Sequence, residues 1–160
     1  MSKNISIAAG AIASIIIAQT AGIVGSIFTA PSIKTWYEFL EKPFFSPPNW
    51  LFAPAWVLLY TLMGIAAFLV WRKKENPARK ETLELYILNL ILNAFWSVLF
   101  FGLKNPGIAF FEIMTLWIVI LIVMMKFFKI EKTAGILFIP YILWVTFAAI
   151  LNLAVWRLNL

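Results

Sequence analysis

Side chains that could bind a ligand or do chemistry are few in this sequence, and they lie inside long apolar runs. Asn89, Asn93 and Ser97 follow one another at intervals of four residues, a spacing that places them on one face of a helix. Trp96 comes seven residues after Asn89 and lies close to the same face. Amides that only hydrogen-bond to neighbouring helices are the structural alternative for Asn89 and Asn93.

Two further segments combine indoles with polar groups. Trp144, Ala148 and Asn152 repeat the four-residue spacing, and Trp56 is followed one helical turn later by Tyr60. Indole rings offer flat apolar faces, and amides and phenols offer hydrogen bonds. Together these side chains favour the binding of a flat, largely apolar ligand.

Conventional catalysis and metal binding are not expected. The chain has no histidine and no cysteine, which excludes the usual general base, the Ser-His-Asp arrangement, thiolate metal sites and disulfides. Glu112 is the one carboxylate well inside an apolar run. An ion pair with Arg157 is one interpretation of it, and a role in binding or proton movement is the other.

The elements that must position these groups are helices that cross a membrane. Of the 160 residues, 63% are apolar and only 12% are charged. In soluble proteins roughly a quarter of all residues are charged. Apolar runs of about 20 residues match the thickness of the bilayer. The sequence therefore predicts an all-α integral membrane protein, a single domain over residues 1–160, with a bundle of five transmembrane helices. The predicted spans are residues 5–28, 50–71, 83–101, 108–128 and 133–156.

The first span carries a face of small residues, which predicts close helix packing within the bundle or across a dimer. These residues are Gly10, Ser14, Ala18, Gly22 and Ser26.

The basic residues predict the orientation of the chain. The net charge is +6, and nine basic residues lie on the side of the N-terminus against four on the other side. The nine are Lys3, Arg72, Lys73, Lys74, Arg79, Lys80, Lys126, Lys129 and Lys132. Because positive loops stay in the cytoplasm, we expect a cytoplasmic N-terminus and an extracytoplasmic C-terminus. The same distribution gives no reason to expect nucleic-acid binding.

The polar groups of the spans share one depth beneath the long loop 29–49. At 1.5 Å per residue, Asn93 and Asn89 lie roughly 12 and 18 Å below the extracytoplasmic end, with Asn152 and Trp144 at roughly 7 and 18 Å. The loop is rich in prolines and aromatic residues, unlike a solvated linker. We therefore expect a pocket in the extracytoplasmic half of the bundle, with residues 29–49 as its lid.

Several ordered motifs resemble the TspO/translocator protein family, also called tryptophan-rich sensory proteins or peripheral benzodiazepine receptors. They are Trp36-Tyr37, Glu41-Lys42-Pro43, Ser46-Pro47-Pro48 with Trp56, Leu88-Asn89-Leu90 to Trp96-Ser97, and Pro140 to Ala148 followed by Leu151-Asn152 and Trp156-Arg157. The resemblance covers nearly the whole chain. It implies a five-helix bundle, commonly a homodimer, that binds tetrapyrroles such as protoporphyrin IX and haem beneath the first loop.

The resemblance also implies roles for individual residues. The positions that line the family's pocket are Tyr37, Trp56, Asn89, Trp144 and Ala148 in this sequence. Trp56 and Trp144 match indoles implicated in light-dependent porphyrin breakdown, so they are the candidate catalytic residues if that reaction occurs. Sterol recognition is not favoured, because Leu153 stands where the family's sterol motif has a tyrosine.

The sequence therefore predicts a tetrapyrrole-binding membrane protein that acts in porphyrin sensing. Its expected ligand-binding residues are Tyr37, Trp56, Asn89, Asn93, Trp96, Trp144, Ala148 and Asn152. No cofactor is obligatory, and metal-free porphyrin should bind, since a haem iron would find only Tyr, Met or no protein ligand. A porphyrin or lipid transporter is one alternative, although no inverted repeat is visible. A slow enzyme that degrades porphyrin under light is the other.

Overall fold

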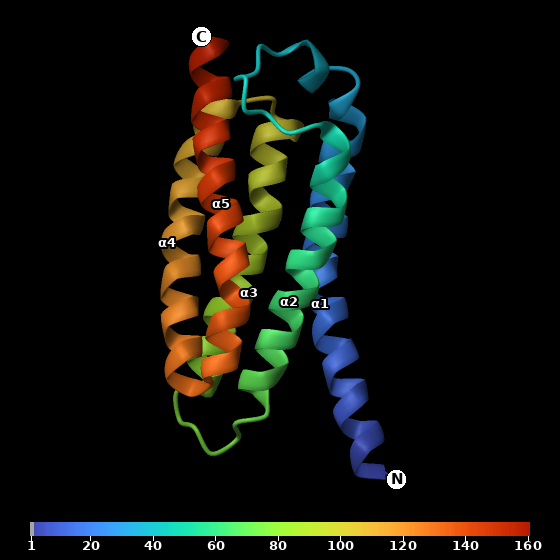
Figure 1. Ribbon diagram of the computed structural model, residues 1–160, viewed down its shortest axis with the longest axis vertical. Helices are drawn as coiled ribbons and strands as arrows, with labels where there is room; N and C mark the ends of the chain where they lie inside the picture. Colours follow the sequence, from blue (N-terminus) through green and yellow to red (C-terminus); the bar gives the residue numbers. More distant parts are fainter. Residues whose placement is uncertain (1) are drawn as a thin grey trace.

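Five long helices make up most of the computed structural model, which describes residues 2–160, with side chains from residue 7 onward. They are α1 (Ser2–Ile33), α2 (Phe52–Trp71), α3 (Arg79–Ser97), α4 (Pro106–Ile130) and α5 (Lys132–Leu158) (Figure 1). A π-helical turn, η3 (Val98–Gly102), continues α3. All five helices are long and apolar enough to cross a membrane, which confirms the predicted fold class. The side chain of Lys3 and the start of the first predicted span lie outside the described side chains.

The first helix is longer than predicted, and the lid loop is correspondingly shorter. α1 continues to Ile33 instead of ending at residue 28, and Pro31 lies in its last turn. No charged residue lies between Lys3 and Lys34, and the hydroxyl of Ser32 donates a 2.9 Å hydrogen bond to the carbonyl of Phe101, which fixes this extra turn. The connection to α2 contains two short 3-10 turns, η1 (Tyr37–Phe39) and η2 (Asn49–Leu51).

α3, α4 and α5 also begin before their predicted spans, whereas α2 begins at Phe52, after a 3-10 turn, instead of at residue 50. α3 begins at Arg79 rather than at residue 83, because its charged first turn lies outside the hydrocarbon layer. α4 begins at Pro106, two residues early, where the side chain of Asn105 caps the helix by accepting a 3.0 Å hydrogen bond from the amide of Ile108. Hydropathy locates the membrane crossing and not the helix ends, which capping determines.

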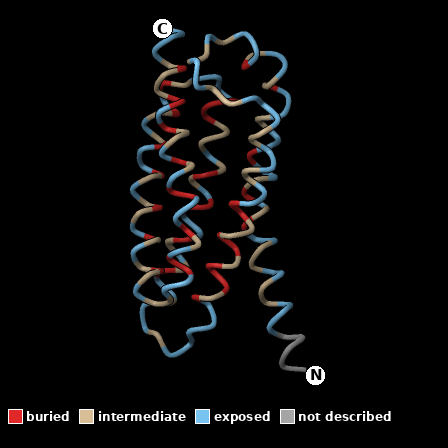
Figure 2. Tube along the Cα trace, viewed as in Figure 1, coloured by how far each residue is buried: buried red, intermediate tan, exposed pale blue. Residues whose placement is uncertain are grey.

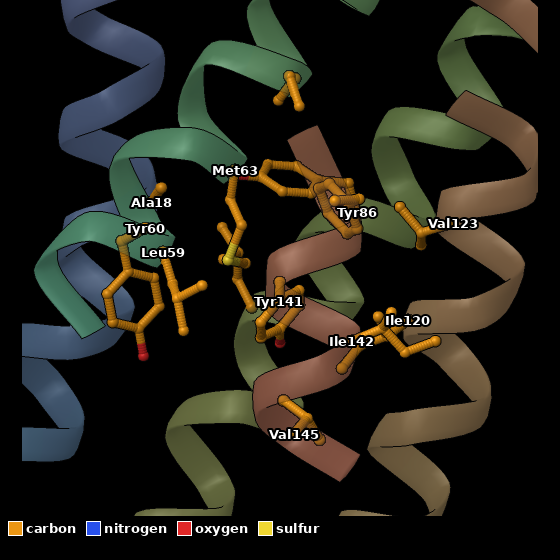
Figure 3. Packing of buried hydrophobic residues seen from close by; sticks show 14 of the residues in the cluster. Ala18, Leu59, Tyr60, Met63, Tyr86, Ile120, Val123, Tyr141, Ile142 and Val145 are labelled. Carbon is orange, nitrogen blue, oxygen red and sulfur yellow. The ribbon is translucent and has the colours of Figure 1, made fainter. Parts of the chain in front are cut away.

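The helices pack in a ring in which α1 contacts α2, α2 contacts α5, α5 contacts α4, α4 contacts α3, and α3 returns to α1. Buried residues line the inner faces of the ring (Figure 2). Tyr141 and Met63 lie in the main core together with Ile120 of α4 (Figure 3). A smaller core lies beneath the long loop and joins Tyr37 to the π-helical turn.

The small-residue face of α1 packs within the bundle. Gly10 lies against the ring of Phe68 and Gly22 against the ring of Tyr60, both of α2. From the α2 side, Gly64 approaches the backbone of Ile15 so closely that a Cβ atom there would lie 2.5 Å from the Cα atom of Ile15. The contact between α1 and α2 thus depends on residues without side chains.

Candidate ligand-binding site

A cavity of about 430 Å³ lies beneath the long loop, between α1, α2, α3 and α5. Its walls are mostly apolar, as is usual for small-molecule sites of 300–1,000 Å³. Among its lining residues are seven of the eight predicted ligand-binding residues, namely Tyr37, Trp56, Asn93, Trp96, Trp144, Ala148 and Asn152. The four-residue repeats on α3 and α5 bring these side chains to one level of the bundle.

The long loop packs across one end of the cavity, near the C-terminus of α5 (Figure 1). The amide of Glu41 donates to Oδ1 of Asn159 at 3.0 Å, and Nδ2 of Asn159 donates to the carbonyl of Glu41 at 2.9 Å. Tyr37 is buried against Phe100 and Phe101, with ring centroids 6.2 and 5.6 Å away, and burial raises the pKa of its phenol. These contacts make the loop a docked roof.

Indoles from three helices form the walls. Trp56 of α2 stacks on Tyr60 with ring centroids 5.3 Å apart, and Trp96 of α3 stacks on Phe100 at 5.0 Å. Trp144 of α5 meets Phe52 edge-on at 6.1 Å, where α2 begins. Several flat ring systems therefore border one cavity, an arrangement that suits a planar ligand.

The buried amides of α3 form hydrogen bonds to neighbouring helices, although Nδ2 of Asn89 has no partner among the described residues. The phenol of Tyr60 donates to Oδ1 of Asn93, whose Nδ2 donates to the hydroxyl of Tyr141 at 3.0 Å. The Tyr141 hydroxyl in turn donates to Oδ1 of Asn89 at 2.9 Å. This chain links α2, α3 and α5 at the floor of the cavity, so both Asn89 and Asn93 hydrogen-bond to neighbouring helices.

Asn89 is the predicted site residue that the structure places away from the cavity. It is fully buried below the floor, and Tyr141 stands between it and the lining residue Asn93. Asn152 lines the cavity, but its Oδ1 accepts a 3.0 Å hydrogen bond from the Trp96 indole and its Nδ2 donates to the carbonyl of Pro106 at 2.7 Å. The amides thus hold the walls in place.

Tyr141 lies at the centre of this network, and its loss should be costly. We expect Tyr141→Phe to lower the free energy of unfolding by about 1–2 kcal/mol, because it removes two hydrogen bonds and leaves Nδ2 of Asn93 and Oδ1 of Asn89 without a partner. Tyr86→Phe is the matched control: its phenol is equally buried but has no hydrogen-bond partner among the described residues, so the change should be neutral or stabilising. Thermal unfolding in detergent measures both variants, and equal losses would contradict the network.

Glu112 does not form the ion pair with Arg157. Both carboxylate oxygens are buried and have no hydrogen-bond partner among the described residues. Arg157 lies exposed near the end of α5, while the indole of Trp156 packs against Phe110 and Phe111 between the two helices, with ring centroids 6.0 Å away in each case.

Sequence reasoning missed the contribution of α1 to the cavity. Gly22, Gly25 and Ser26 line it, together with apolar residues of the same helix. The small-residue face was the available signal, but it predicted only helix packing. Where small side chains meet a helix that carries bulky aromatic rings, such a face also leaves room for a ligand.

Comparison with known proteins decides the family. The sequence model of the TspO/MBR family matches residues 14–157, which include the cavity lining from Gln19 to Val155. The chain belongs to the TspO/MBR family. The family resemblance inferred from the motifs is therefore confirmed.

TspO/MBR relatives match along nearly their whole length. The chain is 43% identical to the tryptophan-rich protein TspO of Archaeoglobus fulgidus, over 92% of this chain and 95% of that protein. It is 38% identical to protein CrtK of Rhodobacter capsulatus, over 87% and 86%. It is 33% identical to the human translocator protein, over 85% and 82%. The TspO/MBR domain thus accounts for the five helices and the roof loop together.

Proposed function

We propose that this TspO/MBR protein binds tetrapyrroles, such as protoporphyrin IX or haem, in the cavity beneath the long loop and acts in porphyrin sensing. The observation that carries the proposal is the cavity itself, with Trp56 and Trp144 on facing helices and a docked aromatic roof. Ring stacking on these indoles supplies the main contacts. The polar edge of the macrocycle lies toward the opening, because the amides of Asn93 and Asn152, which line the cavity, are already paired.

The proposal includes the setting of the protein in the membrane. The excess of basic residues at the end opposite the roof supports a cytoplasmic N-terminus and an extracytoplasmic cavity. A homodimer, which the family resemblance implies, is part of the proposal. Metal-free porphyrin is an expected ligand, since the site offers neither His nor Cys to an iron atom.

Porphyrin titration of the purified protein tests the proposal. We expect the double variant Trp56→Phe, Trp144→Phe to bind protoporphyrin IX about tenfold more weakly, because each smaller ring loses part of a stacking contact of about 1 kcal/mol. The shift of the porphyrin absorption band measures affinity independently of tryptophan emission. Trp71→Phe, at the opposite end of α2 and outside the cavity, is the control and should leave affinity unchanged. Unchanged affinity in the double variant would remove the stacking mechanism.

Light-dependent porphyrin breakdown is a second candidate, and the two indoles that border the cavity favour it. In this reaction the excited pigment would supply the chemistry, with Trp56 and Trp144 as redox partners. Illuminating the complex and following pigment absorbance distinguishes the two functions. Loss of absorbance in the light, slowed in the double variant under saturating porphyrin, supports breakdown; stable absorbance supports binding alone.

A further inference from the structure

A second groove lies in the opposite half of the bundle. It measures about 340 Å³, lies between α1, α2 and α3, and shares no lining residue with the cavity beneath the loop. Ala13 of α1, Phe68 and Trp71 of α2, and Leu83 of α3 are among the residues that line it. Because Ala13 and Trp71 are exposed, the groove opens toward the lipid.

The groove lies at the end of the molecule where α2 connects to α3, away from the roof loop (Figure 1). Trp71 is the last residue of α2, and Leu83 lies in the second turn of α3. Hydrocarbon and head groups therefore meet at the rim of this groove. This is the side that the charge pattern assigns to the cytoplasm.

Three cations surround the aromatic residues of the rim. The guanidinium of Arg72 lies 5.8 Å from the ring centroid of Phe68, and Nζ of Lys74 lies 6.0 Å from that of Trp71. Nη1 of Arg79 donates a 2.9 Å hydrogen bond to the carbonyl of Trp71. These contacts bring the positive charges to the residues that line the groove.

Unlike Lys73, Lys80 and Lys126 at the same end of the bundle, these three cations have no acidic partner among the described residues. Lys73 pairs with Glu131 at 2.5 Å, and this bond lowers the pKa of Glu131. Lys80 lies 3.9 Å from Glu84, and Lys126 pairs with Glu81. In the described part of the chain, no carboxylate lies within ion-pair distance of Arg72, Lys74 or Arg79. Their charge is available to a ligand.

We propose that this groove binds an anionic phospholipid, with an acyl chain along α1 and α3 and the phosphate beside Arg72, Lys74 and Arg79. An apolar groove that opens to lipid fits a hydrocarbon chain, and unpaired cations at its rim fit a negative head group. Basic pockets between helices on the cytoplasmic side are known to hold anionic head groups. The alternative is that the three cations only set the orientation of the chain in the membrane. In that case the groove beside them would not favour an anionic lipid over a zwitterionic one.

Quenching of Trp71 by brominated lipids tests the proposal with the full chain in vesicles. Vesicles of phosphatidylcholine receive the same small fraction of either dibrominated phosphatidylglycerol or dibrominated phosphatidylcholine. The difference in emission between the protein and its Trp71→Phe variant isolates Trp71. We expect the anionic lipid to bind beside Trp71 at least about fivefold more strongly, which is the effect of a single cation near an anionic head group. Equal quenching by the two lipids would overturn the proposal.

Two pairs of variants separate this site from general attraction to the surface. Arg72→Gln with Lys74→Gln should abolish the preference for the anionic lipid. Lys129→Gln with Lys132→Gln, which removes two exposed cations beside the connection of α4 and α5, should preserve it.

Ala13→Leu fills the groove from the lipid side and should weaken quenching by both lipids. Ala9→Leu, one turn away and outside the groove, should not. Equal effects within either pair would contradict a specific site.

Discussion

Replacing Gly64 with alanine should push α1 away from α2 and lower the free energy of unfolding by about 1–3 kcal/mol. The added Cβ atom would lie 2.5 Å from Cα and 2.9 Å from the amide nitrogen of Ile15. Backbone atoms of a continuous helix cannot move aside individually, so the whole contact must shift. Thermal unfolding in detergent, followed by tryptophan emission, measures the effect.

Gly25→Ala is the matched control on the other helix. There the added Cβ atom would meet Oγ of Ser97 at 2.9 Å, and a hydroxyl at the end of a short side chain can rotate away. We expect a loss well below that of Gly64→Ala. If both variants unfold like the unchanged protein, the close contact between α1 and α2 does not contribute to stability.

The depth of the polar residues was the part of the site that the sequence predicted well. Spacing alone placed Asn93, Trp96, Trp144, Ala148 and Asn152 in the half of the bundle beneath the long loop, and all of them line the cavity. The argument works because a helix has a fixed rise and because uncompensated polar groups are costly in hydrocarbon. Neither condition depends on side-chain conformation.

Hydrogen-bond partners could not be predicted in the same way. Tyr141 carried no special signal, yet it stands between Asn89 and Asn93 and turns two candidate ligand donors into a link between helices. Which amide faces a ligand depends on how α3 rotates against α5, and a spacing of four residues leaves that rotation open. The same limit applies to Glu112 and Arg157, which form no ion pair in the described part of the chain.

Aromatic side chains line a binding space in each half of the bundle, but the two spaces differ in their surroundings. Beneath the roof, indoles border a cavity in which the amides of Asn93 and Asn152 are paired between helices. At the other end, Phe68 and Trp71 stack on each other and line an open groove with unpaired cations at its rim. An internal cavity selects by shape, whereas a groove at the lipid boundary selects by head-group charge. Substitutions in one half should therefore leave binding in the other unchanged.

Filling the cavity should abolish ligand binding more effectively than removing an indole. Ala148 lines the cavity on α5, one helical turn after Trp144. Ala148→Phe would add a ring to a space of about 430 Å³. Insertion of extra carbon atoms into a filled site costs about 1–3 kcal/mol, so porphyrin affinity should fall by up to about a hundredfold.

The unliganded protein should tolerate this change, because the ring enters space that the ligand would otherwise occupy. We expect thermal unfolding without porphyrin to stay within about 0.5 kcal/mol of the unchanged protein. Ile150→Phe, on the lipid-facing side of α5 where Ile150 is 55% exposed, is the control for a phenyl ring on this helix and should change neither quantity. Porphyrin affinity that survives Ala148→Phe at its original value would mean that the ligand binds elsewhere, since two occupants cannot share one volume.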